Sequence, residues 1–168
     1  MASNLYFQTF VVFMPIFYTD VFGLAPAAMG TMMLFSRFWD AANDPLMGMI
    51  ADRTDTKWGK FRPYIAGFAI PIGLAGFFAF NTPNFGASGN LIYAYVTYIL
   101  LMMMYTGVNV PYAALMGVIT PNSAERTSVS QYRFAFAFIG QFIAGAVTLG
   151  LVEYFGSGNE AIGWRMVM

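Results

Sequence analysis

The sequence predicts an all-α membrane protein, a partial bundle of about five transmembrane helices followed by the start of a sixth. Its 168 residues are 58% hydrophobic and only 10% charged, whereas a soluble domain carries about 25% charged residues. The apolar residues also fall into long blocks that short polar stretches separate. Most of these blocks approach or exceed the roughly 20 residues that a helix needs to cross a bilayer.

The expected helices follow one another along a single partial transmembrane domain that covers residues 1–168. The linkers between them are short, polar and rich in turn formers, which marks the ends of the helices. Pro111 is expected to bend the fourth helix, and the fifth carries glycines and alanines that allow close helix packing. The expected spans are 4–22, 25–51, 64–80, 91–119 and 133–155, and the sixth helix is expected to begin near Trp164. Five spans and part of a sixth predict that the chain is a piece of a larger protein.

Lysine and arginine residues predict the orientation. Four of them lie in the linker after the second helix, and Arg126 lies in the linker after the fourth, whereas the linkers after the first and third helices carry none. Because basic loops stay in the cytoplasm, we expect loops 52–63 and 120–132 to be cytoplasmic. The chain is then a multi-pass protein of the inner (plasma) membrane, in contact with the lipid bilayer.

The composition excludes several classes of function. The net charge is zero, so no basic surface is available for nucleic acid. The sequence has no Cys and no His, which removes thiolate nucleophiles, histidine bases and the usual transition-metal ligands. We expect no catalytic residues, no cofactor and no metal other than a monovalent cation. A membrane enzyme that acts on lipid-linked sugars is a weaker alternative, because the carboxylates lie too deep in the expected helices.

A cluster of polar side chains in the second helix predicts a cation site. Arg37, Asp40, Asn43 and Asp44 fall within a ~120° arc at about 100° per residue. Their summed charge is −1, and two neighbouring carboxylates at low dielectric need either a cation or a proton. Carboxylate and amide oxygens suit hard cations. The alternative is an Arg–Asp pair that only holds helices together, although this leaves the second aspartate unexplained.

The fourth and fifth helices offer candidate substrate ligands. Tyr105 and Asn109 lie four residues apart on one helix face, and aromatic and amide groups suit sugars. The same residues are also common between packed membrane helices. Arg133 begins the expected fifth helix, where the commoner fate of an arginine is to reach the lipid headgroups.

The loop after the second helix is open to two interpretations. In the first, its basic residues serve only to set the orientation. In the second, they form a salt-bridged latch that opens and closes with the conformation of the protein. The residues of the expected latch are Gly48, Asp52, Arg53, Lys60 and Arg62.

Several motifs together resemble one family of transporters. These are Trp39-Asp40-Ala41-Ala42-Asn43-Asp44-Pro45, Trp58-Gly59-Lys60-Phe61-Arg62-Pro63, Asn109-Val110-Pro111-Tyr112 and Gln131-Tyr132-Arg133-Phe134. In this order and spacing they resemble the glycoside–pentoside–hexuronide:cation symporters of the major facilitator superfamily. The resemblance implies a transporter of two six-helix bundles that works by alternating access. The chain would be most of the N-terminal bundle, and the missing C-terminal bundle would be its partner.

The resemblance also implies roles for individual residues. Asp40, Asn43 and Asp44, with Thr106 from the fourth helix, would form the cation site. Tyr105, Asn109 and Arg133 would line the sugar cavity, and we group Arg37 with these substrate-binding residues. The hypothesis is symport of a sugar, glycoside or uronide with Na⁺ or H⁺. The alternative is a relative in the same superfamily that moves a lipid or another organic solute.

Overall fold

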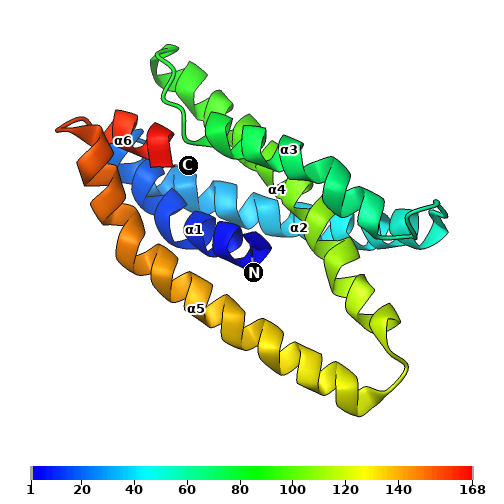
Figure 1. Cartoon of the computed structure of the whole chain (residues 1–168). Coiled ribbons are helices and arrows are strands. Elements are labelled where there is room, and N and C mark those ends of the chain that lie inside the picture. Colours follow the sequence, from blue (N-terminus) through cyan, green and yellow to red (C-terminus); the bar gives the residue numbers. More distant parts are fainter. Residues whose placement is uncertain (1, 168) are drawn as a thin grey trace.

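The computed structural model describes residues 2–167, without the side chains of residues 2–8 and of Ala87, and these residues form helices joined by short connections (Figure 1). Within the described residues there is no β-strand. The elements are α1 (Ala2–Ile16), η1 (Phe17–Val21), α2 (Pro26–Arg53), α3 (Arg62–Ala79), α4 (Gly86–Ile119), α5 (Ser123–Gly156) and α6 (Glu160–Val167).

Three helices begin earlier than the hydropathy pattern predicts. α4 begins at Gly86 instead of Leu91, α5 at Ser123 instead of Arg133, and α6 at Glu160 instead of Trp164. Most of the expected loop 120–132 is therefore helical.

Capping explains the early start of α5. The Asn122 side chain accepts a hydrogen bond from the backbone N–H of Ala124 at 3.0 Å, and Glu125 lies in the first turn and accepts a 2.6 Å hydrogen bond from Thr120. An N-cap side chain and an acidic first turn both stabilise a helix N-terminus. Polar residues in this stretch start a helix instead of forming a linker.

The helices pack in two groups. α3 lies along α4, and α2 packs against α4 from the other side, whereas α1 and α6 pack against α5. Figure 1 shows α5 running away from α4 after the turn at residues 120–122, and the α2–α3 connection standing at the opposite end of the bundle from α6.

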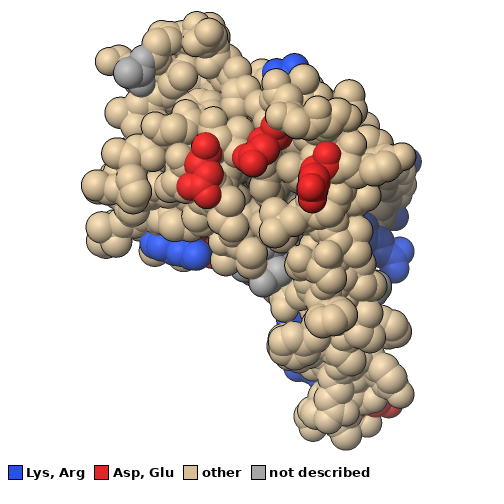
Figure 2. All heavy atoms as spheres, turned by 90° about the vertical axis from the view of Figure 1, so that its left-hand side faces the viewer, with Lys and Arg blue, Asp and Glu red and all other residues tan. Residues whose placement is uncertain are grey.

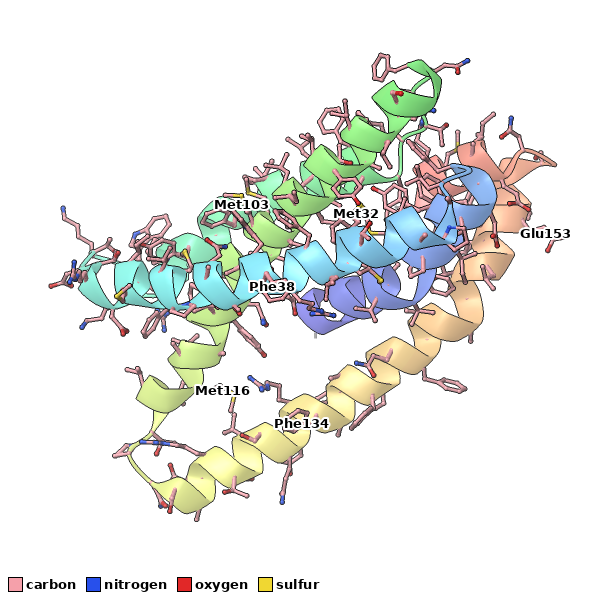
Figure 3. All side chains as sticks on the ribbon, turned by 180° about the vertical axis from the view of Figure 1, so that it is seen from behind. Met32, Phe38, Met103, Met116, Phe134 and Glu153 are labelled. Atoms are coloured by element: carbon pink, nitrogen blue, oxygen red, sulfur yellow. The ribbon has the colours of Figure 1, made fainter. Side chains whose placement is uncertain are left out.

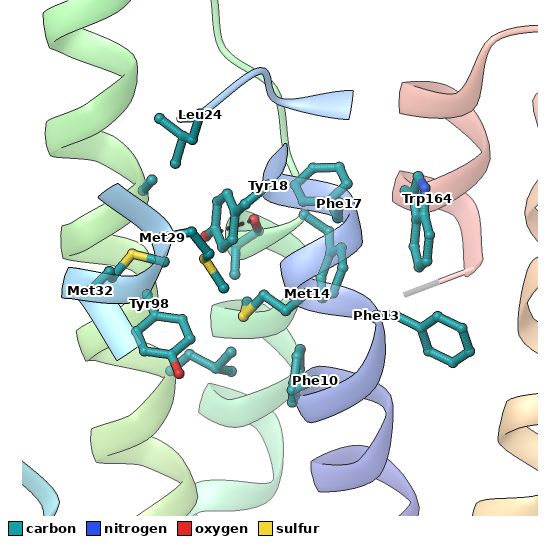
Figure 4. Packing of buried hydrophobic residues seen from close by; sticks show 14 of the residues in the cluster. Phe10, Phe13, Met14, Phe17, Tyr18, Leu24, Met29, Met32, Tyr98 and Trp164 are labelled. Atoms are coloured by element: carbon teal, nitrogen blue, oxygen red, sulfur yellow. Dashed lines mark hydrogen bonds between the residues drawn. The ribbon is translucent and has the colours of Figure 1, made fainter. Parts of the chain in front are cut away.

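The core lies at one end of the bundle. Aromatic and methionine side chains from α1, η1, α2, α4 and α6 meet there with alanines of α3, and Phe17, Tyr18 and Phe80 are fully buried. Trp164 of α6 stacks on Phe80 with ring centroids 5.7 Å apart, and Figure 4 shows Phe17 between Tyr18 and Trp164. The second half of α2, with its charged residues, runs beyond this core.

A short π-helix joins α1 to α2. In η1 the hydroxyl of Tyr18 donates to the backbone carbonyl of Ala79 in α3 at 3.3 Å, and Pro15 lies in the last turn of α1. Proline removes a helical hydrogen bond, and single π-turns occur mostly as irregularities within α-helices. This distortion is anchored to the core by the buried Tyr18.

Among the described residues, three helices are both long and apolar enough to cross a membrane: residues 62–79, 88–119 and 123–156. α2 has 28 residues, which is long enough, but its charged residues lower its hydropathy. The apolar part of the first helix, Thr9–Val21, is shorter. Two of the five expected spans are therefore not among these three. The second helix is too charged, and the apolar part of the first helix is too short.

Candidate functional site

One stripe of α2 faces the interior and leads to the charged residues. Met29, Met32 and Ser36 lie on this stripe and are buried. Asp40 and Asn43 continue it by one and two turns and are half-buried, as the helical spacing requires. The stripe therefore changes from apolar to polar along its length.

Asp40 is the least satisfied acid of the cluster. Its Oδ1 atom is buried and has no hydrogen-bond partner among the described residues. The carboxylate interacts electrostatically with Asp44, which repels it, and with Arg37, which attracts it. A buried carboxylate oxygen without a donor is costly, so this atom is a candidate ligand for a cation or a carrier of a proton.

Thr106 connects the acids of α2 to α4. Its hydroxyl donates a 3.0 Å hydrogen bond to Oδ1 of Asp44, and its side chain is only 4% exposed. Asp44 itself is exposed on its other side. Of the predicted cation ligands, the structure joins Asp44 and Thr106 by a direct bond and places Asp40 and Asn43 on the adjoining turns of α2.

The predicted substrate residues lie next to this cluster. Tyr105 is close enough to Asp44 and Asp40 to interact electrostatically with both. Asn109, one turn further along α4, is half-buried. Because residues four apart share a helix face, Tyr105 and Asn109 present one surface beside the acids. Arg37 is exposed at the edge of the same cluster.

Arg133 reaches α4 from the interior of α5 and not from the start of a helix. Its guanidinium lies 5.7 Å from the ring centroid of Tyr112 and 5.3 Å from that of Phe134, within the range of cation–π contacts. Its Nε atom is buried, and no described residue forms a hydrogen bond with it. Figure 3 shows Phe134 on α5 across from Met116 of α4. The sequence pattern assigned no role to Tyr112, which continues the face of Tyr105 and Asn109 at the next turn.

The expected latch residues are near one another but are not ion-paired. The Lys60 ammonium donates to the backbone carbonyl of Asp52 at 3.5 Å, and no ion pair joins Asp52, Arg53, Lys60 or Arg62 within residues 2–167 of the structure. Gly48 faces α4, since an added Cβ would lie 3.9 Å from Val110. The salt-bridged latch stays a prediction for another conformation.

A second polar feature lies at the opposite end of the bundle and was not predicted. A cleft of about 460 Å³ between η1, α5 and α6 is lined by Asp20, Glu153 and Glu160 among others. Figure 2 shows acidic side chains gathered on this face of the molecule. The three acids come from three different elements, so no local spacing brought them together.

The fold and the site together define a class. Carboxylates and a hydroxyl held between two helices of an all-helical membrane protein are typical of proteins with a solute or ion site within the bilayer. The comparison with known proteins then identifies the family. The chain matches the family of MFS/sugar transport proteins over residues 1–168, and it belongs to that family as one of the glycoside–pentoside–hexuronide:cation symporters. These are transporters and not enzymes.

Individual relatives are similar to nearly the whole chain. The "putative glycoside/cation symporter YagG" of Escherichia coli strain K12 is 46% identical over 163 residues, 97% of this chain and 35% of that protein. The inner membrane symporter YicJ of the same strain is 42% identical over 98% of this chain and 36% of YicJ. The isoprimeverose transporter of Lactiplantibacillus pentosus is 39% identical over 99% of this chain and 35% of that protein. The chain thus spans about a third of the length of the curated relatives it matches.

Proposed function

We propose that the chain supplies the cation site and part of the sugar site of a symporter, which couples the movement of a sugar, glycoside or uronide to that of Na⁺ or H⁺ by alternating access. The observation that carries this proposal is the hydrogen bond between Thr106 and Asp44 at 3.0 Å, beside a buried Asp40 oxygen that has no hydrogen-bond partner in the part of the chain that the structure describes. A hydroxyl, two carboxylates and the Asn43 amide give the oxygen ligands that a small hard cation requires.

Charge explains why one cation is expected. Arg37, Asp40 and Asp44 sum to −1, and Asp40 and Asp44 repel each other. One bound Na⁺, or one proton on either acid, neutralises the cluster. The occupied site would then hold α2 against α4 more firmly than the empty one.

The sugar site is proposed on the same part of α4. Tyr105 precedes Thr106 in the chain, and Asn109 follows one turn later. Arg37 and the Arg133–Tyr112 pair complete a surface with aromatic faces, amide groups and positive charge, which suits polyols and uronate carboxylates. The name of the isoprimeverose transporter supports a glycoside as substrate.

Coupling follows from the adjacency of the two sites. A cation that fixes Thr106 against Asp44 also fixes the neighbouring Tyr105, so binding of each ligand favours binding of the other. The remaining two-thirds of the length found in the relatives would supply a second helix bundle, against which this one moves.

We also propose an orientation in the inner membrane. The α2–α3 connection carries Arg53, Lys57, Lys60 and Arg62, and Arg126 lies in the first turns of α5. The α3–α4 connection at residues 80–85 has no basic residue. By the positive-inside rule, loops 52–63 and 120–132 face the cytoplasm.

Cation-dependent sugar binding in the full-length gene product tests the proposal. We expect Asp44→Asn to abolish the increase in sugar affinity that Na⁺ or acid pH produces, and Asp20→Asn, at the opposite end of the bundle, to leave it unchanged. If Asp44→Asn kept the full cation dependence, the cation site would be misassigned. Flux assays with labelled glycosides and with lysolipids separate a sugar symporter from the lipid-transporting alternative.

A further inference from the structure

An amphipathic pocket opens beside the α2–α3 connection. Its volume is about 490 Å³, within the roughly 300–1,000 Å³ of small-molecule sites. At the mouth it is lined by Thr54 and Thr56 of the connection and by Tyr64 in the first turn of α3. The hydroxyls of Thr54 and Tyr64 are hydrogen-bonded to each other, which fixes the position of the mouth.

The part of the pocket away from the α2–α3 connection is apolar. Further along α3 it is lined by Gly67, Phe68 and Pro71, and from α4 by Met104. From Tyr64 to Pro71 the wall follows two turns of α3, which is about 10 Å at 1.5 Å per residue. The lining thus changes from hydroxyl groups to hydrocarbon along the axis of a helix that is long and apolar enough to cross the membrane.

Basic side chains lie close in sequence to the residues of the mouth. The segment 52–62 has four cations and two carboxylates, a net charge of +2. Its cations make no ion pair within the described residues, and those nearest in sequence to the mouth are exposed: Arg53, Lys57 and Arg62. Trp58, between them, is 69% exposed. Tryptophan and basic side chains together are typical of the headgroup region of a membrane.

We propose that this pocket binds one anionic phospholipid of the leaflet that the α2–α3 connection faces. The phosphate lies among Arg53, Lys57 and Arg62, and an acyl chain follows α3 past Gly67 toward Met104. A soluble anion would contact the basic side chains but not the apolar lining. A neutral phospholipid would contact the apolar lining but would gain nothing from the positive charge. Polybasic segments next to transmembrane helices are attracted to anionic lipids, and basic pockets there bind anionic headgroups. The inference is independent of the solute that is transported.

The fluorescence of Trp58 provides the test. The purified chain, with Trp39→Phe and Trp164→Phe so that Trp58 is the remaining tryptophan, is titrated in detergent with phosphatidylglycerol brominated in its acyl chains, and separately with phosphatidylcholine brominated in the same way. We expect saturable quenching that is at least about 10-fold stronger for phosphatidylglycerol. Lys57→Gln with Arg62→Gln should weaken phosphatidylglycerol binding by about 30-fold, or roughly 2 kcal/mol for two cations, and leave phosphatidylcholine binding unchanged. Lys57→Arg with Arg62→Lys should behave like the parent.

Two glycine-to-leucine variants on α3 test the apolar part of the pocket. Gly67 lines the pocket and Gly73 does not, and both lie on α3 with no atom within 4 Å of an added Cβ. Gly67→Leu should fill the pocket and reduce binding of both lipids, whereas Gly73→Leu should not. Equal quenching by the two lipids would overturn the proposal, as would displacement of phosphatidylglycerol by millimolar inorganic phosphate, or identical behaviour of the two leucine variants. The charge variants lie in an exposed loop and test the proposal even if Gly67→Leu fails to fold.

Discussion

Replacing Thr106 with valine removes the α4 hydroxyl that donates to Asp44 of α2 and keeps the shape of the side chain. The lost bond is the 3.0 Å contact with Oδ1 of Asp44. Hydrogen bonds to charged groups contribute about 1.5–3 kcal/mol in soluble proteins, and side-chain bonds between membrane helices about 0.6–1.7 kcal/mol. Because Asp44 is exposed on its other side, we use the lower range. It corresponds to a loss of about 3- to 20-fold in cation affinity.

Isothermal titration of the purified chain with Na⁺ in choline buffer of constant ionic strength measures this loss. The control is Thr97→Val, also buried in α4, whose hydroxyl donates to the carbonyl of Tyr93 in its own helix at 2.8 Å. A double-mutant cycle with Asp44→Ala isolates the pairwise energy. If Thr106→Val bound Na⁺ as tightly as the parent, or if both valine variants lost affinity equally, the role given to this contact would be wrong.

Three further predictions concern other parts of the structure. Asp40→Asn should abolish the cation-dependent rise in thermal stability, which is about 2.7 kcal/mol at a cation concentration 100-fold above Kd. If Na⁺ stabilised this variant as much as the parent, Asp40 would not be part of the cation site. Gly107→Ala should lower the free energy of unfolding by about 1–3 kcal/mol, because an added Cβ would lie 3.0 Å from the ring of Phe68 in α3. The control Gly117→Ala, where an added Cβ meets open space, should be neutral or stabilising in the same denaturation assay. Asn122→Ala removes the cap of α5 and should cost about 1 kcal/mol, seen as faster hydrogen exchange in the first turns of α5; unchanged exchange would contradict it.

Local patterns predicted the features that local spacing controls. The shared face of Asp40, Asn43 and Asp44 follows from helical periodicity, and the order of the helices follows from hydropathy. The start of α5 did not follow, because hydropathy reads Asn122 and Glu125 as linker residues, whereas their side chains cap and stabilise a helix. A search for capping signals would have placed this boundary correctly.

Features that depend on tertiary packing could not be predicted from the residues alone. The contact of Thr106 with Asp44 joins residues on different helices, and the motif resemblance had to supply it. The stacking of Arg133 on Tyr112 depends on how α5 approaches α4. The cleft lined by Asp20, Glu153 and Glu160 combines acids from three elements, none of which shows any local pattern.

The length of α5 shows which of its residues lie outside the hydrocarbon layer. Its 34 residues measure about 51 Å. To fit within a hydrocarbon layer about 30 Å thick, the helix would have to tilt by more than about 50° from the bilayer normal, whereas membrane helices tilt by at most roughly 40°. The polar turns from Ser123 to Tyr132 therefore lie outside the lipid tails. The boundary between the lipid tails and the water crosses the helix close to Arg133. That guanidinium then lies at the boundary between the lipid tails and the water, deeper than Arg126 on the same helix.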